Sequence, residues 1–293
     1  MTPWILSMVV GCMANRQIAR ALGCSPSTVA HHIARLGRHC MLFQARDLGD
    51  RPLAGDVVID GFESFEFSQY FPFHHNTAVE VGTGFMLYHT DSPLRRKGRM
   101  TIAQRHRRAE LETRFGRPDP RAVESGIREL LEVVTRGCRQ VTVRSDDHRA
   151  YPRAMRGLGC RITHRITSSK QRRDARNPLW EVNLLDLMIR HSTAAHKRET
   201  IAWSKRRQAS AEKLSIFQVW RNYIKRRWEK GSEETAAMLK GLATEPLTIG
   251  DILRKRLFRD HIPLPPRWML YYERRVDTAA LGVNRLHTLS YAD

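Results

Sequence analysis

The chain has 293 residues, and its 50 Lys and Arg against 30 Asp and Glu give a net charge of +20 at pH 7. This excess of positive charge predicts a polyanionic partner. Nucleic acid is favoured over a membrane surface, because no stretch has the apolar length that spans a bilayer. The five cysteines include no Cys-x-x-Cys pair, which fits a reducing cytoplasm and argues against structural zinc.

The N-terminal part predicts a short core helix followed by a helix-turn-helix over residues 14–37. Ile18 and Leu22 are one turn apart on its first helix, and Gly23 suits the turn that follows. Ser25 is then expected to cap the second helix, with Pro26 at its first position. The side chains predicted to face a DNA major groove are Ser27, Thr28, His31, His32 and Arg35. The alternative is a helical hairpin used only for packing; the overall charge favours DNA binding, and the domain is assigned to residues 1–45.

Residues 38–55 are expected to be a linker, and a strand over 56–67 follows it. This strand carries Asp60 within an apolar and aromatic run. A buried carboxylate is costly unless it is paired or bound to a metal. The alternative is a turn at Asp60-Gly61, since Asp-Gly is a common turn pair. Two more strands are predicted at 77–81 and 85–90.

A cationic stretch over residues 94–108 comes next and contains no acid. A charge run is usually a solvated face of a protein. Seven cations of one sign beside a suspected metal site are better explained as a surface that contacts phosphates. The residues assigned to DNA contact here, within a basic insertion at 94–120, are Arg95, Arg96, Lys97 and Arg99.

The next region alternates between helices and strands. A helix is predicted at 122–135, a strand at 141–146, a helix at 151–158 and a strand at 161–167. A basic loop at 168–177 contributes two further DNA-contact candidates, Arg172 and Arg173. A long helix is then expected from about 182 to 207.

This order of elements is that of an α/β ribonuclease-H-like fold, a mixed sheet with flanking helices. We assign it to residues 54–208, between the helix-turn-helix domain and a helical C-terminal region at 209–293. Topology alone is a weak basis for function.

Such a fold would place its first and fourth strands side by side, so Asp60 and Asp146 should meet at one edge of the sheet. A third acid is expected from the last helix of the core. We favour Asp186, which shares a helix face with Asn183 and Arg190. Glu181, at the start of that helix, is the alternative.

Other polar residues near these acids have expected roles. Asn183 would hold a metal-bound water or a carboxylate, and Arg190 would meet a phosphate. Lys197 is expected on the same helix face, seven residues after Arg190. His148 would touch substrate, although a surface histidine is the simpler interpretation.

Three clustered carboxylates need positive charge, because like charges raise one another's pKa. Two Mg²⁺ or Mn²⁺ ions would supply it, since these ions prefer oxygen ligands. A pair of such ions activates the attacking oxygen and stabilises the leaving oxygen at a phosphate. The predicted chemistry is therefore phosphoryl transfer on a nucleic acid.

At these residues the chain resembles the DDE transposases of bacterial insertion sequences. The stretches that carry the resemblance are Val58–Ser64, Leu94–Thr101, Ser145–Tyr151, Asn177–Asp186 and Arg198–Arg206. The resemblance implies cleavage of element ends and strand transfer into target DNA. It also implies a helix-turn-helix that binds terminal inverted repeats, a homo-oligomer that brings two ends together, and a place on the nucleoid in the cytoplasm of a bacterium or archaeon.

One position departs from the family pattern. Related transposases often have Glu on the last helix followed three residues later by Asn, whereas here Asn183 precedes Asp186. Two alternatives therefore stay open. One is a DNA-binding regulator whose core does not cleave, and the other is a nuclease of the same fold that hydrolyses without joining.

Overall fold

A five-stranded mixed sheet forms the centre of the computed structural model, which describes residues 1–48, 53–197, 200–231 and 233–281. The strands are β1 (Val57–Phe65), β2 (Pro72–Glu80), β3 (Met86–Pro93), β4 (Gln140–Ser145) and β5 (Arg161–Ile166), in the order β3-β2-β1-β4-β5. β1, β2 and β3 are antiparallel neighbours, whereas β4 runs parallel to β1, and β5 parallel to β4. Each predicted strand is present, and Asp60-Gly61 lies inside β1, so the turn interpretation of that pair is wrong.

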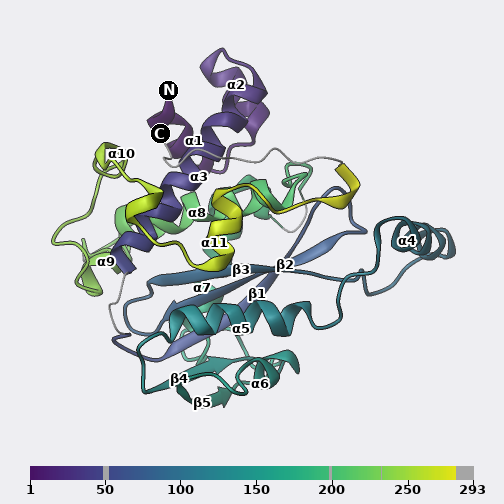
Figure 1. Cartoon of the computed structure of the whole chain (residues 1–293). Coiled ribbons are helices and arrows are strands. Elements are labelled where there is room, and N and C mark those ends of the chain that lie inside the picture. The colour runs from purple at the N-terminus through teal and green to yellow at the C-terminus, as the bar shows by residue number, and fades with distance from the viewer. Residues whose placement is uncertain (49–52, 198–199, 232, 282–293) are drawn as a thin grey trace.

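Helices cover both faces of this sheet (Figure 1). α5 (Ala122–Val134) packs on β2 and β3, and α7 (Trp180–Ser192) packs on β1 and β2 from the opposite side. The alternation of β1 explains this arrangement, because successive strand residues face opposite ways. Val57 and Ile59 belong to the core that contains α5, and Val58 belongs to the core that contains α7.

Three helices precede the sheet: α1 (Thr2–Val10), α2 (Asn15–Leu22) and α3 (Pro26–Leu48). Gly23 ends α2 with a left-handed φ of 63°, a conformation that glycine adopts without strain. The Ser25 hydroxyl accepts a hydrogen bond from the Thr28 backbone N–H at 3.1 Å, as expected of a helix cap.

The expected linker after this unit is wrong over its first half. α3 continues as one helix to Leu48, because its later turns are buried as fully as a core helix. Leu42 and Phe43 have no exposed surface, and α3 packs along α8 (Arg207–Val219). Residues 49–52 of the expected linker lie outside the described residues.

The long helix expected at 182–207 is also wrong. α7 ends at Ser192, where Thr193 takes an extended conformation and its hydroxyl donates to the Ile189 carbonyl. A short 3₁₀ turn, η1 (Ala194–His196), follows, and the next regular helix is α8. Lys197 therefore lies beyond α7 and is exposed, not on the helix face that carries Asn183.

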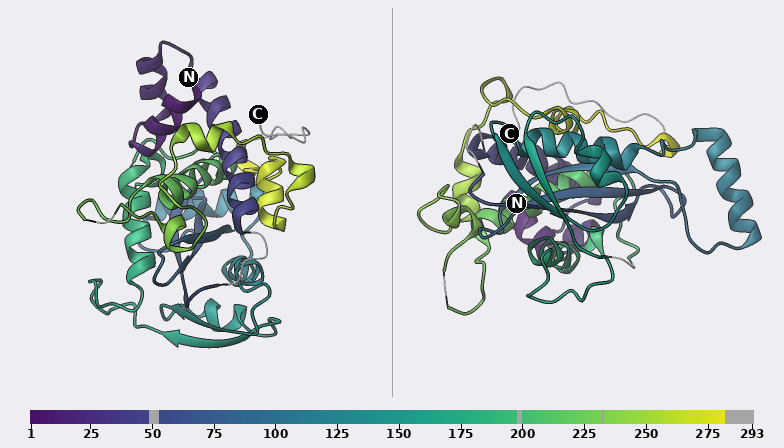
Figure 2. Two further views of the ribbon diagram at one scale, coloured as in Figure 1. Left: turned by 90° about the vertical axis from the view of Figure 1, so that its left-hand side faces the viewer. Right: turned by 90° about the horizontal axis from the view of Figure 1, so that it is seen from below.

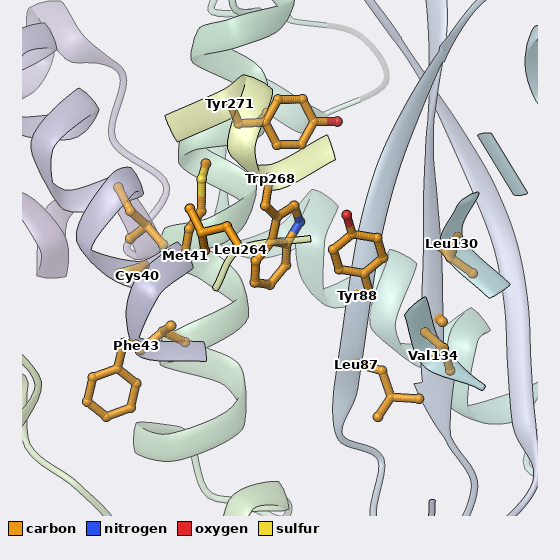
Figure 3. Packing of buried hydrophobic residues seen from close by; sticks show 14 of the residues in the cluster. Cys40, Met41, Phe43, Leu87, Tyr88, Leu130, Val134, Leu264, Trp268 and Tyr271 are labelled. Carbon is orange, nitrogen blue, oxygen red and sulfur yellow. The ribbon is translucent and has the colours of Figure 1, made fainter. Parts of the chain in front are cut away.

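The C-terminal region is helical, and it packs into the core. α8 is buried along nearly its whole surface, and a π-helical turn, η2 (Trp220–Ile224), continues it. The short helices α9 (Ala236–Leu239), α10 (Ile249–Arg254) and α11 (Pro266–Tyr272) follow, with 3₁₀ turns at Arg259–His261 and Ala279–Leu281. Figure 3 shows Trp268 of α11 between Met41 of α3 and Tyr88 of β3.

The basic insertion forms a helix of its own, α4 (Ile102–Phe115), which projects from the sheet (Figures 1 and 2). The sequence interpretation recognised the charge of this segment and missed the helix. Its start is a capping box, in which the Thr101 hydroxyl accepts from the Gln104 N–H and the Gln104 side chain accepts from the Thr101 N–H.

Three fully buried histidines lie between the sheet and α8. His75 bonds through Nε2 to Ser210 at 2.8 Å, His89 bonds to Ser215 at 3.1 Å, and the His196 ring centroid is 5.3 Å from that of His75. Burial lowers the pKa of each, to about 3 for His196. These side chains are therefore neutral in the folded protein at pH 7.

These histidines predict acid sensitivity of the fold. Their folded pKa values lie below the unfolded value of about 6.5, so the unfolded state binds more protons as the pH falls. Their full contribution is present above pH 6.5 and is lost progressively below it. We expect the free energy of unfolding to fall as the pH is lowered from 6.5 to 5. Urea titrations at these pH values measure this loss, and His196→Gln should reduce the pH slope; an unchanged slope would contradict the interpretation.

Candidate functional site

The register between β1 and β4 brings two of the predicted acids together. Val57 pairs with Val143, and Val58 pairs with Arg144. Asp60 on β1 lies three residues after Val57, and Asp146, just after β4, lies three residues after Val143. The same register therefore places Asp60 opposite Asp146. Asp60 also shares a strand face with Val58 and Phe62, which is the face that α7 covers.

α7 contributes the third acid to the same place. Asp60, Asp146 and Asp186 line one pocket of about 850 Å³, which we call the carboxylate pocket. Asn183 and Arg190, one turn before and after Asp186, line it too. Glu181 instead lines a neighbouring pocket, so the structure places Asp186 and not Glu181 beside the other two acids.

The protonation behaviour of the site agrees with a cluster of acids. The pKa of Asp60 is raised to about 6. Burial is the main cause and the Asp146 charge adds to it, while hydrogen bonds from the Gly61 N–H and the Tyr151 hydroxyl and the Arg173 charge oppose the rise. The Gly61 N–H donates to the Asp60 carboxylate at 2.7 Å. Burial and a neighbouring like charge both disfavour the ionised form of a carboxylate.

Tyr151 is a site residue that the sequence interpretation missed. It is buried on α6 (Ala150–Ala154), and its hydroxyl donates to Asp60. Burial raises the pKa of Tyr151 well above its usual value, and the charges of Asp60, Asp146 and Asp186 raise it further. One phenol therefore lies within the field of all three acids, where it can orient Asp60. Its place five residues after Asp146 was the available signal.

His74 and Glu63 also line the carboxylate pocket and were not predicted. They face each other across the β1–β2 register. Burial lowers the pKa of His74 to about 4, with contributions from the His148 and Lys97 charges, so His74 is neutral at pH 7. Burial raises the pKa of Glu63, and the Arg190 charge opposes that shift.

The remaining residues proposed around the acids fall in different places. His148 is exposed, its ring centre lies 5.3 Å from that of Tyr151 in a tilted contact, and its backbone N–H donates to Asp146. Arg173 lines the carboxylate pocket. Arg172 points into solvent and pairs with Asp174 at 3.6 Å.

The four DNA-contact candidates before α4 divide into two pairs. Arg95 makes two hydrogen bonds to Glu112 of α4, and the Arg96 guanidinium lies 4.8 Å from the Tyr70 ring centre. These interactions occupy Arg95 and Arg96 within the protein. Lys97 and Arg99 are exposed, so their side chains are the ones available to a phosphate backbone.

The helix-turn-helix candidates lie together. Ser27, Thr28, His31, His32 and Arg35 line one hollow of about 330 Å³ on the outer face of α3. Val29, Ile33 and Leu36 are buried on the opposite face, as the helical period predicts.

The donor set of the carboxylate pocket suits a divalent cation only in part. Carboxylate oxygens are the ligands of Mg²⁺ and Mn²⁺, and three carboxylates line this pocket. Among the described residues, however, no three His, Cys, Asp or Glu side chains are close enough to share an ion. This arrangement fits an ion held by one or two carboxylates, with water and substrate oxygens as its other ligands, a mode that Mg²⁺ favours.

Comparison with known proteins identifies the N-terminal part. Residues 4–39 match the GerE family, described as bacterial regulatory proteins of the luxR family. The chain thus has an N-terminal helix-turn-helix DNA-binding domain, as predicted, joined to a mixed α/β region. No helix in the described part of the chain is long and apolar enough to cross a membrane.

The comparisons give the α/β region no family. No curated protein matches the chain. Among solved structures, a chain of the simian T-cell lymphotropic virus intasome in complex with PP2A regulatory subunit B56 gamma matches at 12% identity, with a TM-score of 0.25. The match covers 65% of this chain and 57% of that chain, and a TM-score this low defines no shared fold.

Proposed function

We propose that the protein is a DNA transposase with a ribonuclease-H-like core, which cleaves DNA with divalent metal ions and transfers a strand to target DNA. The observation that carries the proposal is the convergence of Asp60, Asp146 and Asp186 on one pocket, around the Tyr151 hydroxyl. The strand order and the helix-turn-helix agree with it. Transposases synapse two ends, so we expect a homo-oligomer.

In this proposal two Mg²⁺ or Mn²⁺ ions are present when substrate is bound, and each ion takes oxygens from only one or two of the three acids, with water and substrate oxygens as its other ligands. The ions would supply the positive charge that polarises a phosphodiester and lowers the pKa of the attacking hydroxyl. Tyr151 would hold the Asp60 carboxylate in position. Arg173 and Arg190 would contact phosphate oxygens, because both side chains line the same pocket.

The activity is tested with a plasmid that carries the coding region and its flanking DNA, which should include imperfect inverted repeats. We expect nicking at the repeat ends with Mg²⁺ or Mn²⁺, and joining of a pre-cut 3′ end to target DNA. Cleavage without joining would indicate a hydrolytic nuclease. Sequence-specific DNA binding without cleavage in either metal would contradict the proposal that the protein is an enzyme.

A second candidate is a DNA-binding regulator without cleavage activity. Two observations favour it: residues 4–39 match a family of regulatory proteins, and no three acidic, histidine or cysteine side chains in the described residues lie at ligand spacing. The plasmid assay separates this candidate from the transposase.

Arg35 tests the DNA-binding surface that both candidates share. Arg35→Ala should weaken binding to duplexes selected from a random-sequence pool by roughly 5- to 150-fold, as expected for the loss of a contact worth about 1–3 kcal/mol. Fluorescence anisotropy measures the change. Arg139→Ala, which removes an exposed arginine near the start of β4, is the control. Equal binding by both variants would contradict the assignment of this face.

A further inference from the structure

A second pocket, of about 550 Å³, lies beside the carboxylate pocket. Its side chains come from β4, from β5, from the loop before α7 and from the first turn of α7. Three arginines line it, namely Arg144, Arg165 and Arg176, and we call it the arginine pocket. Glu181 is the one acid among its lining residues.

The arginines differ in what they contact. Arg144 donates two hydrogen bonds to Asp56, which fixes its guanidinium and offsets its charge. Arg165 and Arg176 are exposed, and neither side chain forms an ion pair with another described residue. Two guanidinium groups thus remain available to an anion, and guanidinium is well matched to phosphate oxygens.

The two pockets share a wall. Trp180, the first residue of α7, lines both of them. The loop before α7 supplies Arg173 to the carboxylate pocket and Arg176 to the arginine pocket. A nucleic-acid strand in the carboxylate pocket that continues past Trp180 would therefore meet the arginine pocket.

We propose that the arginine pocket binds the sugar–phosphate backbone of a DNA strand whose neighbouring phosphate lies in the carboxylate pocket. The path of the strand into the carboxylate pocket rests on the proposed function. Binding of phosphates by the arginine pocket rests on its own side chains. Arg165 and Arg176 would each contact a phosphate, and Arg144 would shape the wall. Sequence interpretation placed DNA contacts on Arg172, whose side chain lines neither pocket.

The test compares two charge-matched double variants of the full chain. Arg165→Gln/Arg176→Gln removes the two available guanidinium groups. Arg136→Gln/Arg161→Gln removes two exposed arginines that line neither pocket, one of them on the same strand as Arg165. Anisotropy with a labelled DNA duplex is recorded over a range of salt without metal, so that the readout does not depend on cleavage.

Loss of two phosphate contacts should reduce the slope of log K against log salt by about 2, because each contact contributes about 0.9. The contribution of the helix-turn-helix domain is the same in all proteins and cancels. We expect the reduced slope for Arg165→Gln/Arg176→Gln and a wild-type slope for the control pair. Equal slopes in the two variants would overturn the proposal.

A measurement with inorganic phosphate distinguishes two ligands of the arginine pocket, the DNA backbone and a free anion. A thermal shift by phosphate that is lost in Arg165→Gln/Arg176→Gln, together with a wild-type DNA slope, would make the pocket a phosphate site and overturn the DNA assignment. A reduced slope in a protein that cleaves no DNA would uphold the arginine pocket while the proposed function fails. The two proposals are therefore distinguishable.

Discussion

Asp60→Asn should abolish metal-dependent cleavage, with a loss of at least about 10³-fold, while DNA binding stays nearly unchanged. Asn keeps the size of the side chain and removes the charge that would hold a cation. Electrostatic stabilisation at a reacting phosphate is a large part of catalysis in water-excluded sites, so its loss should be severe. Asp60 lies on the face of β1 opposite to that of Val57 and Ile59. It is not part of the helix-turn-helix domain, so DNA binding by that domain should be retained.

The matched control for this variant is Asp147→Asn. Asp147 is exposed beside Asp146 and does not line the carboxylate pocket. We expect wild-type nicking of the plasmid from this variant. Equal loss of cleavage and binding in Asp60→Asn would mean that the substitution unfolds the core. Equal cleavage by Asp60→Asn and wild type would show that Asp60 has no role in cleavage.

Trp268→Ala should destabilise the protein by about 3–5 kcal/mol, the cost of a large buried aromatic side chain. Trp268 has no exposed surface, its ring centre lies 4.9 Å from that of Tyr88, and its indole N–H donates to the His89 carbonyl at 3.1 Å. The substitution leaves a cavity between α3, α11 and the sheet, and also an unsatisfied carbonyl. Urea denaturation followed by far-ultraviolet circular dichroism measures the change.

Trp228→Ala is the control for that measurement. Trp228 is 50% exposed, so its loss should change the free energy of unfolding by less than about 0.5 kcal/mol. A loss of about 1 kcal/mol or less in Trp268→Ala would show that the C-terminal segment does not stabilise the core.

Local patterns in the sequence were sufficient to predict the five strands and the helix-turn-helix. The apolar period of β1 and the Gly23–Ser25–Pro26 turn are signals that neighbouring residues carry. The same patterns placed Asp60 within one strand and Asp146 at the end of another strand that could lie beside it. They also gave Asn183, Asp186 and Arg190 a common helix face.

What the sequence failed to predict depends on contacts between distant segments. α3 extends to Leu48 because α8 covers its later turns. The residues near α3 in the sequence do not predict this contact with α8. α7 stops at Ser192 because Thr193 turns away, although the residues after it have good helix propensity. The arginine pocket is formed where β4, β5 and the loop before α7 meet, so its role could not be read from spacing. Tyr151 reaches Asp60 only because β4, which precedes α6, pairs with β1.

The central claim is that the carboxylate pocket holds divalent cations, and Mn²⁺ binding measured by electron paramagnetic resonance tests it most directly. In the wild-type protein, free Mn²⁺ signal should fall as protein is added, and Asp60→Asn and Asp146→Asn should each remove that effect. Equal binding of Mn²⁺ by wild type and both variants, or no binding by any of them, would contradict the claim.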